Sequence, residues 1–364
     1  MPKFNRHFFS YRMNSVGGDI IYRSKENTLT SLSGRVFPSL PMEVESFYFG
    51  KIKSWYWADN CNGQIYFFDP VADEIIYQNK REEFKVTIGR KPIFVDDSRI
   101  LLSRRVEGEK RVCILNLKDF SFVDVLYKGN YGYPEYKLIV DRVPDGDGRI
   151  DFLIAYDTLT GLEKWRYADL REYKAVLSDE IKTESVRSIL ALVGETLWVL
   201  LDTGRIVGLD PATGESKKNI EIDTVDLTHF ENAETEFINA RGIGATYVSG
   251  EEKVIYLSSN IYFEIDLTAD NPTRICYNVK QTFKDSDVTG GGHQCVNSRY
   301  VFFNESMIGT LGAFDRQTKK VVWVDKLINH KPDAGAVREL KATETQLYVH
   351  DNKQSLFVFD LTWN

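Results

Sequence analysis

Three closely spaced aspartates, Asp145, Asp147 and Asp151, are the first residues whose types and spacing suggest chemistry. Carboxylates two residues apart, with Gly148 to allow a sharp turn and a later acidic residue, suit a hard cation such as Ca²⁺. Val143, however, stands where the first carboxylate ligand would be needed, and the same residues form an ordinary hairpin turn. We therefore predict a hairpin with little or no calcium binding, and keep the three aspartates as candidate metal ligands.

A second polar segment, residues 285–295, brings two aspartates, three consecutive glycines, His293 and Cys295 together in the sequence. A histidine and a cysteine can bind a metal or act as a base and a nucleophile. Their spacing matches no ligand rule, and nothing forces a base and a nucleophile together. We predict a connection between repeats, with His293 entering the next strand. The sequence suggests no catalytic residue, and we expect no cofactor.

The segment Asn219–Ala240 contains acidic side chains and no Lys or Arg. One interpretation is a solvated loop, and the other is an electronegative rim for a basic protein partner, because a patch of one sign steers association. Two phenylalanines within it are suitable anchors for such a contact. The candidate partner-binding residues are therefore Phe230, Glu231, Glu234, Glu236 and Phe237.

The amino-acid composition limits the kinds of molecule that the chain is expected to bind. The chain has 364 residues, a net charge of −7 and 43% hydrophobic residues. An acidic balance argues against general binding to nucleic acid or to an anionic membrane. Residues 1–10 lack the apolar core of a secretory signal, and no window approaches the ~20 apolar residues of a membrane span. The four cysteines, Cys61, Cys113, Cys276 and Cys295, form no C-x-x-C pair, so we expect them to fill the hydrophobic core. We also expect the protein to be monomeric and cytoplasmic.

The chain repeats one pattern seven times, and repeats decide the fold. A short apolar run ends in Asp or Asn, a turn follows, and a second apolar run comes next. The mean spacing is about 48 residues, close to the ~40–50 of a four-stranded propeller blade. An Asp or Asn at that point accepts a hydrogen bond from the backbone two residues on. These anchor residues are Asp69, Asn116, Asp157, Asp210, Asp266, Asp315 and Asp360.

One repeat divides completely into four short strands, 187–193, 196–201, 205–210 and 216–222, joined by tight turns. Four such strands cannot bury both faces alone, and radial stacking of repeats supplies the missing contact. We therefore predict an all-β, seven-bladed β-propeller of four-stranded antiparallel blades, with residues 1–364 as one domain. The last anchor lies near the end of the sequence, so an N-terminal strand within residues 1–40, around Phe4–Arg12 or Asp19–Arg23, is expected to complete the last blade and close the ring.

Asp157-Thr-Leu-Thr-Gly161-Leu-Glu-Lys-Trp165 resembles the repeat of pyrroloquinoline-quinone-type propellers, in which Asp, Thr-Gly and Trp recur at this spacing. Asp210-Pro-Ala-Thr-Gly214 is a second match, and Asp315 with Trp323 a third. The resemblance implies a fold rather than a chemistry. Some members of this group are quinone-dependent dehydrogenases, and others are outer-membrane assembly factors that bind proteins without a cofactor. Both kinds are exported, whereas residues 1–10 of this chain show no signal.

In propellers, the connections between blades and the turns between second and third strands share one end of each sheet. The connections here are long, and long connections on a rigid scaffold are where function concentrates. We predict a non-catalytic scaffold that binds another protein at that end, as a cytosolic antitoxin (immunity-type) or assembly protein. An enzyme or small-molecule binder, with its pocket at the mouth of the central channel, is the alternative.

Overall fold

A computed structural model describes the greater part of the chain. The described residues are 2–9, 13–16, 19–23, 29–32, 46–49, 56–59, 65–69, 74–78, 85–86, 93–96, 98–106, 109–116, 119, 121–125, 131–133, 136–144, 151–174, 180–221, 244–290, 292–305 and 309–362.

The described residues are almost entirely β-strands, and the strands pair with their neighbours in the sequence. Six sheets have four strands, and a seventh, β10–β13, has the same four-strand path with β9 added. A three-stranded sheet, β2–β4, and a two-stranded pair, β18–β19, complete the set. Every ladder between consecutive strands with a described register is antiparallel. The expectation of an all-β chain built from four-stranded antiparallel sheets is confirmed.

The strands of the first half are β1 Pro2–Phe9, β2 Met13–Val16, β3 Asp19–Arg23, β4 Leu29–Ser31, β5 Ser46–Phe49, β6 Tyr56–Asp59, β7 Ile65–Asp69, β8 Glu74–Gln78, β9 Lys85–Val86, β10 Ile93–Asp96, β11 Arg99–Val106, β12 Glu109–Asn116, β13 Phe122–Val125, β14 Tyr131–Tyr133, β15 Leu138–Pro144, β16 Asp151–Asp157 and β17 Glu163–Tyr167. The remaining elements are β18 Glu172–Lys174, β19 Ile181–Thr183, β20 Val186–Val193, β21 Thr196–Leu201, β22 Ile206–Leu209, β23 Ser216–Ile220, β24 Thr246–Val248, β25 Lys253–Leu257, β26 Ile261–Asp266, β27 Ile275–Asn278, α2 Lys280–Asp285, β28 Gln294–Val296, β29 Tyr300–Asn304, β30 Thr310–Asp315, β31 Lys320–Lys326, the 3₁₀ turn η2 Leu327–Asn329, β32 Val337–Ala342, β33 Gln346–Asp351 and β34 Ser355–Leu361.

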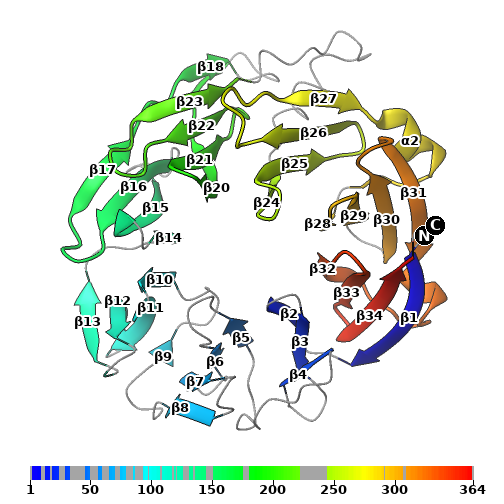
Figure 1. Cartoon of the computed structure of the whole chain (residues 1–364), viewed down its shortest axis with the longest axis horizontal. Coiled ribbons are helices and arrows are strands. Elements are labelled where there is room, and N and C mark those ends of the chain that lie inside the picture. The colour runs from blue at the N-terminus through cyan, green and yellow to red at the C-terminus, as the bar shows by residue number, and fades with distance from the viewer. Residues whose placement is uncertain are drawn as a thin grey trace. The chain divides into compact units, whose positions relative to one another are not determined.

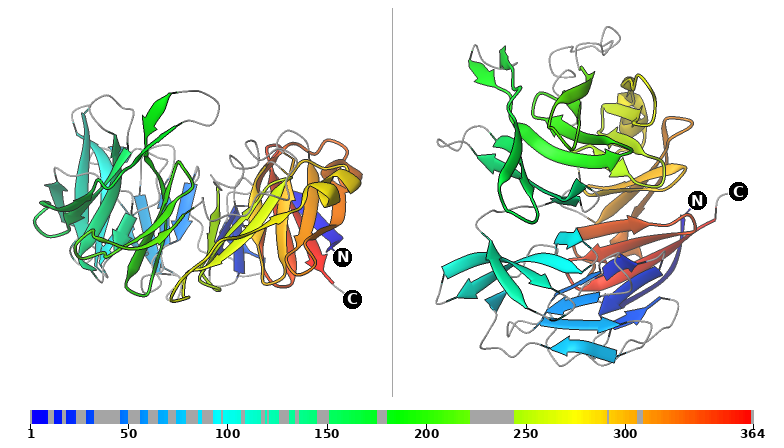
Figure 2. Two further views of the ribbon diagram at one scale, coloured as in Figure 1. Left: turned by 90° about the horizontal axis from the view of Figure 1, so that it is seen from above. Right: turned by 60° about the vertical axis from the view of Figure 1, so that its left-hand side comes forward.

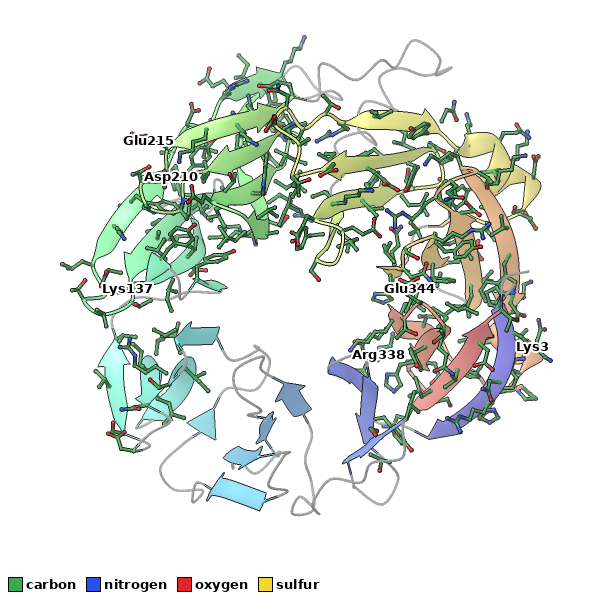
Figure 3. The ribbon with its side chains drawn as sticks, viewed as in Figure 1. Lys3, Lys137, Asp210, Glu215, Arg338 and Glu344 are labelled. Carbon is green, nitrogen blue, oxygen red and sulfur yellow. The ribbon has the colours of Figure 1, made fainter. Side chains whose placement is uncertain are left out.

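All seven predicted anchors occupy the same place in their sheets. Six of them end the third strand of a four-strand path or follow it directly, as Asp210 follows β22, and Asp360 is the last residue but one of β34. The fully divided repeat is confirmed as β20–β23, with strand ends within two residues of the predicted ones. Figure 3 shows Asp210 and Glu215 at the turn between β22 and β23.

The anchors close their turns through the expected hydrogen bonds. The carboxylate of Asp157 accepts from the Leu159 backbone N–H at 2.9 Å, and that of Asp210 accepts from Ala212 N–H at 2.7 Å. Both turns end on a glycine with positive φ, +69° at Gly161 and +77° at Gly214. In the turn after Asp315 this place is taken by Lys319, whose φ is +58°. A lysine in this left-handed conformation is strained, because its Cβ crowds the backbone.

The N-terminal strand β1 pairs with β34, in a sheet of order β1–β34–β33–β32. Of the two segments expected to complete the last repeat, the one beginning at Phe4 therefore lies in the strand that pairs with β34. Asp19–Arg23, the other, is wrong in that role, because as β3 it pairs with β2 and β4. The strands β2–β4 thus form a three-stranded sheet that carries none of the seven anchors.

The chain divides into two compact units, each with its own core. Unit 1 comprises residues 1–8, 143–152 and 167–364, and unit 2 comprises residues 9–142 and 153–166. In unit 2, buried Val95, Leu101, Ile114 and Ile139 form one cluster. Within unit 1, the sheets β20–β23, β24–β27, β28–β31 and β32–β34 with β1 follow one another in chain order (Figure 1). Figure 2 shows β1 beside β34 in two further views.

Neighbouring sheets of unit 1 share apolar clusters. Trp198 of β21 and Phe263 of β26 belong to one cluster and are fully buried. Tyr262 and Phe314, whose ring centroids are 4.9 Å apart, belong to the next. A third cluster, which includes Trp323, joins β28–β31 to β32–β34. The hydrophobic contact between sheets therefore supplies the burial that a single four-stranded sheet lacks.

In the described part of the chain, no helix is long and apolar enough to cross a membrane.

Candidate binding surface

In unit 1 one end of each sheet carries the turn between its second and third strands and the segment that leads into its first strand. We call this the connection end. The opposite end carries the turns between third and fourth strands, where the anchors lie. The two cavities described below, which lie within the described part of the chain, both open at the connection end.

A repeated polar device fixes the backbone at the connection end. A side chain at the end of the second strand accepts a hydrogen bond from the backbone N–H of the residue that leads into the first strand of the same sheet. Its three instances are Asp202 with Ser185 N–H at 3.0 Å, Asn304 with His293 N–H at 2.7 Å, and Asp351 with Gly335 N–H at 2.9 Å. Because the segment entering each of these three sheets is tied to its own second strand, this end presents a preorganised surface.

Asp351 is the most deeply buried of the three. It is 0% exposed, and its carboxylate also accepts from Lys353 N–H at 2.9 Å and Ser355 N–H at 2.7 Å. Three charge-assisted bonds to backbone donors compensate the cost of burying the carboxylate. The turn between β33 and β34 is thereby held against the segment before β32.

A buried ion pair supports the same end near β20. Arg205 Nε donates to Glu184 Oε1 at 3.1 Å, and Thr203 Oγ1 donates to the same carboxylate at 2.6 Å. Burial raises the pKa of Glu184, but the hydrogen bonds and charge of Arg205 outweigh burial and hold the pKa below its ordinary value. Arg171 N–H also donates to this carboxylate at 3.0 Å. The network ties the segment before β18 to the β21–β22 turn.

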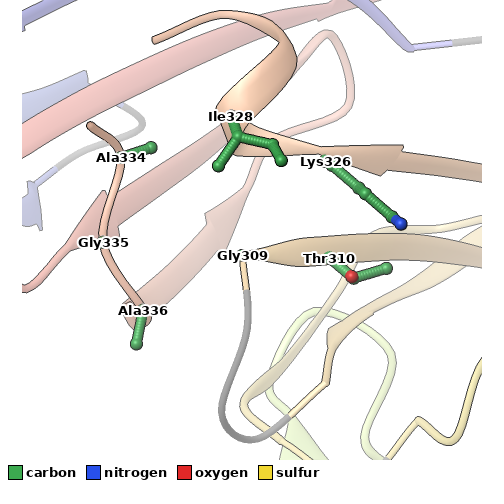
Figure 4. Close-up of a pocket in the computed structure, with 7 residues that line it drawn as sticks. All are labelled: Gly309, Thr310, Lys326, Ile328, Ala334, Gly335 and Ala336. Carbon is green, nitrogen blue, oxygen red and sulfur yellow. The ribbon is translucent and has the colours of Figure 1, made fainter. Parts of the chain in front are cut away.

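The first cavity, which we call the alanine cavity, has a volume of about 310 Å³. It lies between the start of β30, the end of β31 and the segment before β32 (Figure 4). Ile328, 54% exposed, forms part of its wall. Its lining residues are Gly309, Thr310, Lys326, Ile328, Ala334, Gly335 and Ala336.

The second cavity, which we call the hydroxyl cavity, has a volume of about 280 Å³ and lies where β24–β27 and β28–β31 adjoin. Gln294 Nε2 donates to the Leu257 carbonyl at 2.7 Å, and Thr289 N–H donates to Glu305 at 3.0 Å, which fixes two sides of it. None of the described lining residues carries a charge: Gly244, Thr246, Tyr256, Leu257, Ser258, Ser259, Thr289, Gly290, Gly292 and Gln294.

A charged cluster at the opposite end joins two sheets. Arg316, which follows β30 and is 5% exposed, contacts both carboxylate oxygens of Glu251 at 2.6 Å and Glu264 at 2.8 Å. Burial raises the pKa of Glu264, but the hydrogen bonds of Arg316 outweigh it and lower the pKa to about 2. The pKa of Arg316 is raised by the two carboxylates, although burial opposes the shift. All members are mutually satisfied, so the cluster acts as a structural link rather than a reactive site.

Most of the site residues predicted from the sequence lie outside the residues that the structure describes. Phe230, Glu231, Glu234, Glu236 and Phe237 lie outside the described residues, and their role in partner binding stays a prediction. Asp145 and Asp147 also lie outside them, while Asp151 is the first residue of β16. In the part of the chain that the structure describes, no group of three or more His, Cys, Asp or Glu side chains could hold a metal ion.

The histidine–cysteine segment does not look reactive. Gly290 has φ +61°, α2 occupies residues 280–285, and Cys295 lies in β28 directly after the His293 backbone contact. Burial raises the pKa of the Cys295 thiol, and it raises that of Cys276 to about 11. A thiol is nucleophilic as the thiolate, so these groups are poorly suited to attack at neutral pH.

The polar device of Asp202, Asn304 and Asp351 was missed in the sequence. Its signal is an Asp or Asn that ends the mainly apolar second strand or follows it directly, as in Leu201-Asp202 and Phe303-Asn304. The cavities had no such signal, because their linings come from segments that only the packing of sheets brings together.

Comparisons with known proteins identify the fold. BamB from Moraxella catarrhalis superposes with a TM-score of 0.58 at 10% identity, over 100% of this chain and 99% of that one. Sqt1 from Saccharomyces cerevisiae superposes with a TM-score of 0.54 at 10% identity, over 99% of this chain and 98% of that one. At such identity the likeness shows the fold alone, a β-propeller. No curated protein matches this sequence.

The predicted resemblance to pyrroloquinoline-quinone-type repeats is confirmed by a family model. The model is described as "Outer membrane protein assembly factor BamB", and it matches residues 138–325. This stretch is more than half of the 364 residues, and it contains the best-matching repeats at Asp157, Asp210 and Asp315. The chain therefore belongs to the family of outer membrane protein assembly factor BamB.

Proposed function

We propose that this chain is a protein-binding scaffold whose partner docks at the connection end. The observation that carries the proposal is the repeated fixing of that end by Asp202, Asn304 and Asp351. A backbone that is already fixed loses little conformational entropy when a partner binds. The two cavities beside it offer places for a partner's side chains. Membership of a family named for protein assembly supports the same role.

A matched pair of variants tests the docking end. Ile328→Glu places a charge at the connection end, whereas Leu159→Glu places one in a turn between a third and a fourth strand. The two side chains are similarly exposed, at 54% and 61%. We expect quantitative cross-linking to recover a partner with wild type and Leu159→Glu, and to lose it with Ile328→Glu. Equal recovery with all three would contradict docking at this end.

We further propose that the partner is basic and meets the acidic segment 219–240. Reversal of Glu231, Glu234 and Glu236 to Lys changes the charge by six units. Rim charges act mainly on the association rate, so binding should slow at least about tenfold at low salt. The difference should shrink towards ~0.5 M salt, because screening then acts within a few ångströms. Unchanged kinetics at low salt would assign the segment to solvent.

An assembly factor and an antitoxin are the two specific versions of this scaffold, and the family description favours assembly. They differ in the partner's fate, since an antitoxin abolishes its partner's toxicity. We keep the cytoplasm as the proposed location, and cell fractionation tests it. Recovery with the outer membrane would overturn the cytoplasmic version and leave the scaffold in place.

We also propose that residues 1–364 form one closed propeller. The pairing of β1 with β34 supports closure by an N-terminal strand. Seven sheets carry an anchor, the number of blades predicted. The three-stranded sheet β2–β4 carries no Asp or Asn anchor, so it is not counted among the seven. An experimental structure tests both closure and blade number.

A further inference from the structure

The alanine cavity combines an apolar wall with a cation, Lys326, for which the described residues provide no ion pair, and the scaffold proposal does not use this combination. We propose that it is a binding site for a carboxylate carried on a short aliphatic group. The lining, the strand register and the charges around the cavity each support this assignment.

The apolar wall is formed by Ile328, Ala334 and Ala336, with two glycines between them. A Cβ added at Gly309 would lie 3.1 Å from Leu327 Cβ and 3.3 Å from the Gly335 carbonyl oxygen. A side chain there would therefore wedge into the space between β30 and the segment before β32. A space of about 310 Å³ is at the lower end of the range for ligand sites, so the ligand is small.

The polar side of the cavity consists of Lys326 and Thr310. These residues are directly opposite each other in the β30–β31 ladder, so both side chains lie on one face of the sheet. Figure 4 shows them together, across the cavity from Ala334 and Ala336. Thr310 is 3% exposed, and no described residue hydrogen-bonds its hydroxyl. A threonine hydroxyl that lines the cavity and has no hydrogen bond to a described residue can donate one to a bound anion.

The charge of Lys326 is not cancelled by a fixed ion pair among the described residues. The nearest carboxylate in the sequence, Asp325, is engaged elsewhere. It accepts from Lys326 N–H at 2.7 Å and Asn329 Nδ2 at 2.9 Å, and its other oxygen lies 2.7 Å from His330 Nε2. Asp351, behind Gly335, is occupied by three backbone N–H groups.

One ammonium and one hydroxyl suit a monoanion better than a phosphate, which needs more donors. The apolar wall opposite them suits a few aliphatic carbons. This chemistry has two sources, a free short-chain acid or the C-terminal carboxylate of a polypeptide. If the ligand is a free acid, the site is independent of the scaffold proposal. If it is a polypeptide C-terminus, the site rests on the scaffold proposal and names the group that the partner inserts.

The test uses the full chain and ligand-observed NMR. Isovalerate represents a free acid, and the dipeptide acetyl-Ala-Val represents a polypeptide C-terminus, with its amide as the uncharged counterpart. We expect a dissociation constant on the order of 1 mM for the preferred acid, a usual strength for so small a ligand. Lys326→Met should weaken binding at least about tenfold, and Thr310→Val by about threefold. Lys326→Arg should retain binding.

Lys320→Met is the matched control, because Lys320 is exposed at the other end of the same strand. It should leave binding unchanged. Binding of isovalerate alone supports a free acid, and binding of the dipeptide supports a polypeptide terminus. Equal binding of the amide, unchanged binding in a folded Lys326→Met chain, or no binding of either acid at about 20 mM would overturn the site. Loss of carboxylate binding with partner recovery intact would leave the scaffold proposal standing.

Discussion

At the scale of single residues, the polar side chains at the ends of the sheets mainly fix the backbone through hydrogen bonds. Asp157 and Asp210 close turns at one end of the sheets, and Asp202 and Asp351 fix backbone at the other. Such buried or half-buried groups are stable only when their hydrogen bonds are complete. Their removal should therefore cost more than the loss of an ordinary surface contact.

Arg316 gives the clearest stability prediction at this scale. Arg316→Met removes the closer of the two cations that Glu251 and Glu264 share, each carboxylate being about three-quarters buried, and leaves only Lys253 at 3.5–3.6 Å. Breaking a buried pair by removing one partner costs about 3–5 kcal/mol, and partial exposure of the carboxylates reduces this to roughly 2–3 kcal/mol. Denaturant unfolding measures it. The surface pair of Lys217 and Asp210 provides the control, since Lys217→Met should change stability far less.

The same cluster predicts a pH dependence. The pKa of Glu264 is about 2 in the folded chain, below its ordinary 4.5. The ionised form is thus favoured by folding, so its contribution is complete above pH 4.5 and disappears as the pH falls towards 2. We expect Glu264→Gln to be less stable than wild type at pH 7, by up to roughly 3 kcal/mol. The two unfolding curves should converge between pH 4.5 and 2, and parallel curves would contradict this.

At the scale of elements, β1 is the clearest example of a strand whose place depends on residues far along the chain. The Phe4 ring stacks on His330 with centroids 4.2 Å apart, and it meets Phe359 edge-on at 5.7 Å. Asn5 Nδ2 donates to Asp360 at 2.8 Å. The sequence indicates a strand here, but its partners are more than 300 residues away.

Removal of the Phe4 ring tests the attachment of β1. We expect Phe4→Ala to lower the free energy of unfolding by about 2 kcal/mol, because the ring is half-buried and a fully buried one is worth 3–5 kcal/mol. Hydrogen exchange should become faster in β34, the strand that β1 covers. Lys3→Ala, at an exposed neighbouring position labelled in Figure 3, should change neither. Unchanged exchange in both variants would mean that β1 contributes little to this sheet.

At the scale of the whole molecule, the repeated sheets are the source of stability. Each sheet of unit 1 shares an apolar cluster with the next, as Trp198 and Phe263 show. The contacts divide the chain into two units, whereas the repeat pattern predicts one domain over residues 1–364. Stacked repeats are stabilised by their neighbours, so the interfaces between sheets determine how cooperatively the chain unfolds.

Calorimetry tests the single-domain prediction. If residues 1–364 form one closed propeller, unfolding should be a single transition with equal calorimetric and van't Hoff enthalpies. Two transitions, or a van't Hoff enthalpy clearly below the calorimetric one, would indicate that the two units unfold separately. Arg316→Met, which lies in unit 1, should then shift only one of them.

The local structure of this chain follows from patterns of neighbouring residues. The seven anchors, the strands of residues 186–220 and the positive φ of Gly161 and Gly214 depend on a few neighbouring residues, so their pattern predicts them. A strand pattern does not specify a pairing partner, so it could not decide whether the segment from Phe4 or Asp19–Arg23 pairs with β34. Only the tertiary structure decided which strand meets β34, how Arg316 finds Glu251, and where the alanine cavity lies. These features join residues that are far apart in the chain, and the packing of whole sheets, rather than local propensity, brings them together.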